Sequence, residues 1–99
     1  MPAQTYATPT EILALPLETG LIGGLQLDVQ PWRAEVYVDG EYAGVVDDFR
    51  GYYHHLDLAA GGHLVGIVAP DHRPLIIEVM IAPGYTSTYR GTLARVSGR

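Results

Sequence analysis

Hydrophobic and polar residues alternate along most of the chain that follows Gly24. A period of two residues is typical of strands that bury one face. Within this pattern the Asp39-Gly40 pair predicts a two-residue hairpin turn, because both residues tolerate positive φ. Turn residues recur about every ten positions and separate seven short strands, expected at residues 25–29, 34–38, 42–46, 56–58, 63–67, 75–81 and 86–93.

This pattern predicts an all-β fold, an antiparallel β-sandwich of about seven short strands with no convincing helix. Each of the two sheets buries one face against the other. The start of the chain differs, because prolines and glycines interrupt it and no alternation is sustained there. We therefore expect residues 1–23 to form an arm or linker, residues 24–95 the sandwich, and residues 96–99 a tail.

The composition is that of one small domain. The chain has 99 residues, 47% of them hydrophobic and 17% charged, which is enough for a core without metal or disulfide support. The absence of Cys excludes disulfides, Cys nucleophiles and thiolate zinc sites. A formal net charge of −5 argues against a nucleic-acid partner.

The chain carries no predicted signal peptide or membrane-inserting segment. Its first thirty residues contain no Lys or Arg, so the positive region that begins a signal peptide is missing. The longest apolar stretch there, residues 12–17, contains Pro16 and is too short to cross a bilayer. A piece of a longer exported protein remains an alternative that fits the same observations.

Several short motifs follow one another between Gly24 and Leu93, over roughly three-quarters of the chain. They are G-L-Q-L-D-V at 24–29, P-W-R-A-E-V-Y-V-D-G at 31–40, V-D-D-F at 46–49, L-D-L at 56–58, G-G-H at 61–63 and P-G-Y-T at 83–86. In their spacing they resemble a PEGA domain of the envelope-associated subgroup that combines V-Y-V-D-G with V-D-D-F. Two departures are Pro31-Trp32-Arg33-Ala34, which keeps only the ends of the name-giving tetrapeptide, and Asp71-His72, which replaces the usual Gly-Tyr.

The resemblance implies a transthyretin (prealbumin)-like β-sandwich. It also implies a non-catalytic module of a bacterial cell-envelope protein, with the parent protein in the periplasm or at the cell surface. The family has no catalytic residues to carry over. It assigns His63 a structural role, in which a ring nitrogen bonds a loop carbonyl.

The candidate catalytic groups form no recognisable set. Ser87 and Ser97 are the two serines, and neither lies in a G-x-S-x-G elbow. His54 and His55 are adjacent, so on a strand they project to opposite faces and do not readily share a metal ion. We therefore predict no catalytic residues and no enzymatic activity.

Acidic residues flank the predicted hairpin and the segment that leaves it. Asp39, Asp47 and Asp48 offer carboxylate oxygens of the kind that calcium prefers, although their order does not match an EF-hand loop. Asp47 and Asp48 can equally accept bonds from backbone N–H groups in the turn, without any metal. A calcium site at these residues and plain turn chemistry therefore remain alternatives, and no other cofactor is expected.

Three aromatic residues are the candidate ligand-binding residues: Trp32, Tyr52 and Tyr53. An exposed aromatic ring beside carboxylates and Arg suits stacking on a sugar ring or a protein hot spot. The alternative for such residues is cross-strand pairing, in which a ring such as that of Tyr37 only stabilises the sheet. A contiguous exposed patch containing the three candidates favours binding over a structural role.

Three functional hypotheses follow. The first is an interaction module that binds a cell-wall glycan or an envelope protein, the second is a structural spacer in a larger exported protein, and an uncharacterised enzyme is a distant third. The hydrophobic run from Leu75 to Ile81, with only Glu78 to deter pairing, adds a question of self-association. At a sheet edge this run predicts a weak dimer by strand pairing, and in a sheet centre it predicts ordinary core and a monomer.

Overall fold

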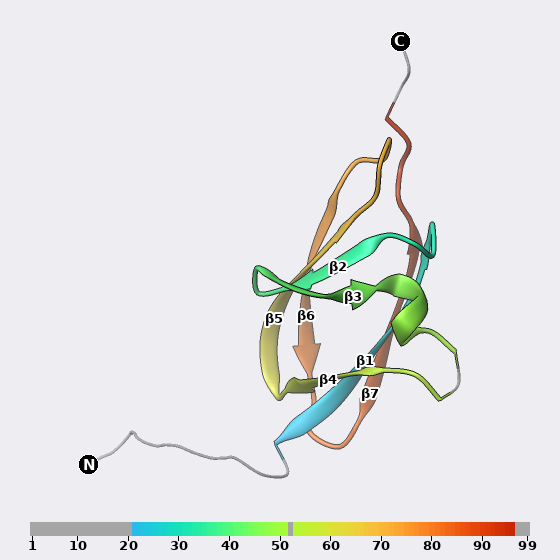
Figure 1. Ribbon diagram of the computed structural model, residues 1–99. Coiled ribbons are helices and arrows are strands. Elements are labelled where there is room, and N and C mark those ends of the chain that lie inside the picture. Colours follow the sequence, from blue (N-terminus) through green and yellow to red (C-terminus); the bar gives the residue numbers. More distant parts are fainter. Residues whose placement is uncertain (1–20, 52, 97–99) are drawn as a thin grey trace, which may run out of the picture.

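The computed structural model describes residues 21–51 and 53–96, and these contain seven strands and one short 3-10 helix (Figure 1). The elements in chain order are β1 (Ile22–Gln30), β2 (Glu35–Val38), β3 (Glu41–Val45), η1 (Val46–Phe49), β4 (Leu56–Ala59), β5 (Gly61–Val68), β6 (Leu75–Ile81) and β7 (Thr86–Thr92). The expectations for residues 1–20, Tyr52 and residues 97–99 lie outside the described residues.

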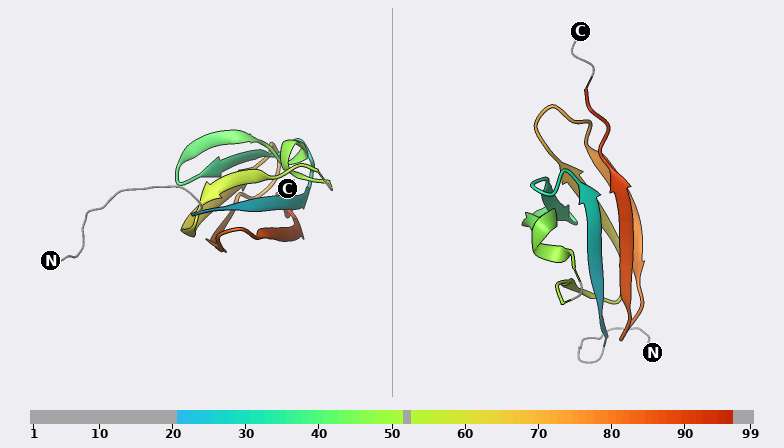
Figure 2. Two further views of the ribbon diagram at one scale, coloured as in Figure 1. Left: turned by 90° about the horizontal axis from the view of Figure 1, so that it is seen from below. Right: turned by 90° about the vertical axis from the view of Figure 1, so that its right-hand side faces the viewer.

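The strands form two sheets that pack as a β-sandwich. One sheet has the order β4-β1-β7 and the other the order β3-β2-β5-β6. The predicted all-β sandwich of about seven strands is confirmed. Neighbouring strands are antiparallel except β1 and β7, which run side by side in the same direction (Figure 2). Alternation does not predict that parallel pair, because it shows which face of a strand is buried and not which strand lies beside it.

The core lies between the sheets and is built from the inward positions of the alternating strands. On β1 the residues Leu25, Leu27 and Val29 are buried, while Asp28 between them is exposed and Gln26 is half-buried. Val65 and Ile67 of β5 face them from the other sheet and are also fully buried. Burying each such side chain stabilises the fold by about 1.5–3 kcal/mol.

The Asp39-Gly40 turn joins β2 and β3 as predicted. Asp39 has φ 52° and Gly40 has φ 88°. Positive φ at both central residues matches the right-handed twist of the flanking strands, and it explains why Asp-Gly occupies this turn.

The sandwich begins earlier than the expected boundary at residue 24, because Ile22 and Gly23 already belong to β1. Gly23 is not a linker glycine. A Cβ on it would lie 2.6 Å from Cγ2 of Ile81 and would also collide with the carbonyl oxygen of Ala82. The turn between β6 and β7 therefore packs directly on this backbone, and the Gly24 N–H donates to the Tyr85 carbonyl over 2.9 Å.

The η1 helix takes the place of the end of the third predicted strand. Val46, expected as the last residue of that strand, begins η1, and both Val46 and Phe49 are buried against the core. The Asp48 carboxylate accepts a bond from the Val45 N–H over 3.0 Å and closes this turn of helix. No helix within residues 21–51 and 53–96 is long and apolar enough to cross a membrane.

Candidate functional site

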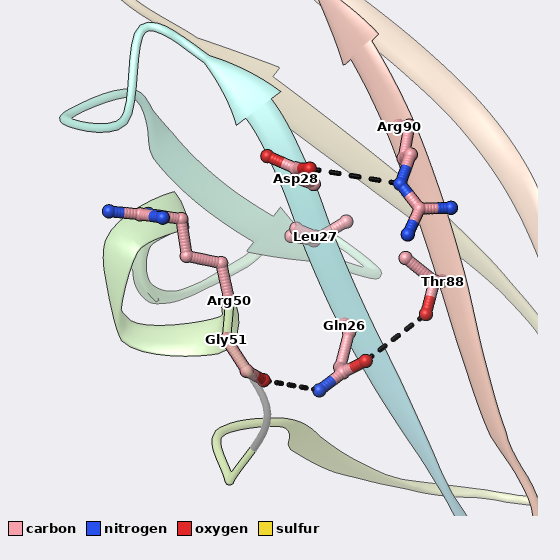
Figure 3. Close-up of a pocket in the computed structure, with 7 residues that line it drawn as sticks. All are labelled: Gln26, Leu27, Asp28, Arg50, Gly51, Thr88 and Arg90. Carbon is pink, nitrogen blue, oxygen red and sulfur yellow. Dashed lines mark hydrogen bonds and ion pairs between the residues drawn. The ribbon is translucent and has the colours of Figure 1, made fainter.

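A polar groove lies on the outer face of the three-stranded sheet. The short strand β4 pairs only with Ile22–Leu25 of β1. On that side the rest of β1 lies beside η1, Arg50, Gly51 and His54. The space between them is a groove of about 340 Å³, crossed by outward side chains of β1 and β7 (Figure 3). Its lining residues are Gln26, Leu27, Asp28, Arg50, Gly51, Thr88 and Arg90.

Gln26 holds the two sides of the groove together. Its amide Nε2 donates to the carbonyl oxygens of Gly51, over 2.5 Å, and His54, over 3.1 Å. Its Oε1 accepts from the Thr88 hydroxyl over 3.1 Å. The amide therefore links β7, β1 and the segment before β4 in one row of hydrogen bonds, two of which Figure 3 shows. The row orients the polar groups at the floor of the groove.

The two arginines of the groove stand on either side of β1 (Figure 3). Arg90 lies 3.7 Å from the Asp28 carboxylate, and both side chains are more than half exposed. Exposed pairs of this length contribute about 0–1 kcal/mol. Arg90 is therefore weakly held and accessible to a ligand.

Arg50 is held more firmly. Its Nε donates to Oδ1 of Asp47 over 2.7 Å, and its guanidinium carbon lies 3.6 Å from the centroid of the Trp32 ring. A guanidinium stacked on an indole combines cation–π attraction with contact between two flat groups. The planar group of Arg50 is therefore oriented before any ligand arrives.

The predicted aromatic residues differ in their exposure and in their contacts. Trp32 is 44% exposed and stands next to the groove through its contact with Arg50, which covers one face of its ring. Tyr53 is 83% exposed and lies between Gly51 and His54, on the segment that borders the groove. Tyr52 lies outside the part of the chain that is described. Neither Trp32 nor Tyr53 lines the groove itself. A contiguous patch of the three candidates stays a prediction.

Each of the three predicted carboxylates has a partner in the protein. Oδ1 of Asp39 accepts from the Leu64 N–H over 2.9 Å, Asp48 accepts from the Val45 N–H, and Asp47 pairs with Arg50. For Asp48 this is the turn chemistry that stood as the alternative to calcium, and Asp39 accepts a backbone bond of the same kind. Among residues 21–51 and 53–96 no three His, Asp or Glu side chains are grouped so that they could hold a metal ion. Calcium binding by these residues remains a prediction for experiment.

His63 joins two turns of the sandwich. Its Nδ1 lies 2.6 Å from Oδ2 of Asp39 and its Nε2 lies 2.7 Å from the carbonyl oxygen of Ala59. The carbonyl belongs to the last residue of β4 and not to a loop, but a ring nitrogen of His63 does bond a backbone carbonyl, as a structural role requires. A carbonyl and a carboxylate both accept hydrogen bonds, so these two contacts favour the imidazolium form, in which both ring nitrogens donate.

The same contacts shift both pKa values of this pair. The hydrogen bond to Asp39, and then the one to Ala59, raises the pKa of His63 against the effect of burial. The hydrogen bond from His63, supported by the Leu64 amide, lowers the pKa of Asp39. The pair therefore stays charged over a wider pH range than either group would alone.

One aromatic contact follows the structural alternative. Tyr37 and Tyr42 lie on the neighbouring strands β2 and β3 with ring centroids 5.6 Å apart, in an edge-to-face arrangement. This geometry is typical of a stabilising aromatic pair. Tyr37 is thus a cross-strand pairing residue, as expected for it.

Sequence reasoning did not single out Gln26, Asp28, Thr88 and Arg90. They occupy outward positions of alternating strands, and the alternation alone makes such residues indistinguishable from ordinary solvent-facing ones. The parallel pairing of β1 with β7 brings them together.

No protein-family model matches the chain, and no curated protein matches it. The resemblance to PEGA domains, and the transthyretin-like topology that it implies, therefore stay predictions.

Proposed function

We propose that this protein is a non-catalytic interaction module of a bacterial cell-envelope protein, and that its polar groove binds a cell-wall glycan. The observation that carries the proposal is Arg50, which Asp47 and the exposed ring of Trp32 hold flat at the groove. An oriented guanidinium loses little conformational freedom when it binds a carboxylate.

The chemistry of the groove suits an elongated, polar and partly anionic ligand. Cell-wall glycans present hydroxyl, acetamido and carboxylate groups along an extended chain. The groove offers amide, hydroxyl, guanidinium and carboxylate groups from Gln26, Thr88, Arg90 and Asp28. Amides and hydroxyls both donate and accept hydrogen bonds, and guanidinium groups bind carboxylates in pairs of bonds. The sequence resemblance supports the same class, since it implies a module of exported proteins.

Co-sedimentation of the purified protein with peptidoglycan sacculi tests the proposal. We expect the protein to pellet equally with calcium and with EDTA, because the groove uses no metal. Arg50→Ala and Arg90→Ala should each weaken binding about fivefold to thirtyfold, the effect of losing about 1–2 kcal/mol at a contact residue.

Arg73→Ala is the matched control, because Arg73 is an exposed arginine that does not line the groove. It removes the same charge and should leave sedimentation unchanged. An equal loss in all three variants would show that binding depends on net charge and not on the groove. Pelleting that requires calcium would move the site to the predicted residues Asp39, Asp47 and Asp48.

A structural spacer is the second candidate. The Tyr37–Tyr42 contact favours the spacer, because these two rings pack against each other and stabilise the sheet. A wild-type protein that stays in the supernatant under every condition would contradict wall binding and leave the spacer, or a protein partner, as the better proposal.

A further inference from the structure

Strand β6 forms one edge of the four-stranded sheet. The sheet order is β3-β2-β5-β6, and β5 pairs with β6 along its whole length (Figure 1). No strand within the described part of the chain pairs with the other side of β6. Backbone N–H and C=O groups along that side therefore face outward, where another strand can bind them.

The other sheet edges carry features that oppose strand pairing. The edge strand β4 has only four residues. The edge strand β3 has five residues, a register shift opposite β2, and Gly44 with φ 147°. The edge strand β7 carries mainly hydroxyl side chains together with Arg90. Short length, irregularity and charge are the common protections of such edges.

β6 lacks these protections. It is a regular strand of seven residues with the sequence LIIEVMI, in which Glu78 is the single charge. On its outer face Ile76 is 70% exposed and Met80 is 74% exposed, on either side of Glu78. Exposed apolar residues of this size along an open edge are typical of an interaction site.

The apolar surface continues from β6 across the sheet. Gly66 lies opposite Ile76 on one side and Tyr37 on the other, and Leu64, which is 55% exposed, lies opposite Glu78. A shallow apolar groove runs over this region, lined by Tyr37, Gly40, Leu64, Gly66, Val68, Pro74 and Ile76. A strand added beside β6 would extend this surface and cover part of its border.

We propose that two copies of this protein associate through β6, which pairs antiparallel with β6 of the partner subunit and joins the two four-stranded sheets. A second copy fits this edge because the contact is isologous: one interface satisfies two open edges at once. This inference is independent of the proposed function, because the polar groove lies on the other sheet.

The charge on Glu78 disfavours one register of the pairing. Opposite residues in an antiparallel pair share a face, so the two-fold axis lies midway between one residue and the same residue of the other strand. An axis at Glu78 would set two carboxylates directly opposite each other, which destabilises a pair. An axis at Ile77 places Glu78 opposite Ile76 of the partner subunit, and an axis at Val79 places it opposite Met80 of the partner subunit, so both avoid that repulsion.

Sedimentation-velocity centrifugation of the full chain, over a range of protein and salt concentrations, tests the proposal. We expect a monomer–dimer equilibrium that shifts toward the dimer as salt rises, because each copy carries a net charge of −5 and salt screens the repulsion. Hydrogen exchange should show β6 amides that become more protected as protein concentration rises. A monomer at all concentrations would overturn the proposal.

Four variants locate the contact. Ile76→Glu and Met80→Glu place a carboxylate opposite Glu78 of the partner subunit in the Ile77 and Val79 registers respectively, so one of them should raise the dimer dissociation constant about tenfold or more. Glu78→Val should lower that constant, and it keeps the test valid if the other two variants fail to fold. Ile22→Glu is the matched control, because it adds the same charge at an exposed isoleucine on the other sheet, and it should leave the constant within about threefold. Equal loss with Ile22→Glu and unchanged exchange at β6 would overturn edge pairing.

Discussion

At the scale of single residues, the clearest electrostatic feature is the pair of His63 and Asp39. It links the β2–β3 turn to Ala59, at the end of β4, through bonds of 2.6 and 2.7 Å. The His63 side chain is only 14% exposed, so its bonds are better shielded from water than those of the surface pairs. The stability of this end of the sandwich should therefore depend on pH.

The pH dependence follows from the two pKa shifts. The pKa of His63 is raised above its ordinary value of 6.5, so the stability it contributes is fully present below pH 6.5 and is lost as pH rises through the higher pKa of the folded state. The pKa of Asp39 is lowered below 3.8, so its contribution is present above pH 3.8 and is lost as pH falls through the lower folded value. The pair therefore stabilises the fold most between pH 3.8 and pH 6.5, where both contributions are fully present.

We predict that His63→Gln destabilises the protein more at pH 5.5 than at pH 8.5. Urea unfolding of the wild type and the variant at both pH values measures the difference. His54→Gln is the control, because His54 is exposed and its ring is not part of this pair. It should change the unfolding free energy little at either pH. A His63→Gln effect that grows toward pH 8.5 would contradict the charged pair.

At the scale of the elements, β1 contributes most to the sandwich. It is the central strand of its sheet and supplies Leu25, Leu27 and Val29 to the core, while its outward residues Gln26 and Asp28 form the floor of the groove. The same alternation therefore builds the core on one face and the candidate site on the other. The outward face of β5 is less polar than that of β1, since its outward residue Leu64 is apolar and exposed.

We predict that Leu27→Ala lowers the free energy of unfolding by about 2–5 kcal/mol, because it leaves a cavity in a fully buried position. Leu64→Ala, the same change at a 55% exposed position, should cost less than about 1 kcal/mol. Guanidinium unfolding of the two variants gives both values under the same conditions. Similar costs for the two substitutions would contradict the assignment of the inward and outward faces.

At the scale of the whole molecule, the two proposed surfaces belong to different sheets. The polar groove lies on the three-stranded sheet, and the β6 edge belongs to the four-stranded one (Figure 1). A dimer through β6 leaves both grooves open and so carries two of them. On a repetitive wall polymer, two linked sites bind more tightly than one, because the second binding event is intramolecular.

We predict that the variant that weakens the dimer, Ile76→Glu or Met80→Glu, reduces co-sedimentation with sacculi although its groove is intact. Its affinity for a short soluble glycan fragment, measured by calorimetry, should equal that of the wild type, because one fragment occupies one groove. Arg50→Ala should show the opposite combination: weaker binding of the fragment and an unchanged dimer dissociation constant. A loss of fragment affinity in that β6 variant would indicate that the two surfaces are not independent.

The candidate site could be predicted only in part. Trp32 was recognisable as a candidate because an aromatic ring beside carboxylates and Arg suits ligand stacking, and the carboxylate of Asp48 was recognisable as a turn acceptor. The partners that complete the groove were not. Gln26 and Thr88 are 62 positions apart in the chain, and they meet only because β7 returns to lie parallel to β1.

By itself the sequence determined the seven strands, their buried faces and the Asp39-Gly40 turn. These depend on local alternation and on the φ values that individual residues tolerate, and both can be read from neighbouring positions. Only the tertiary structure decided which strands are neighbours, and with it the groove between β1 and η1 and the open edge at β6. The physical reason is that burial requires an apolar partner but does not specify which strand provides it, so pairing depends on the packing of the whole chain.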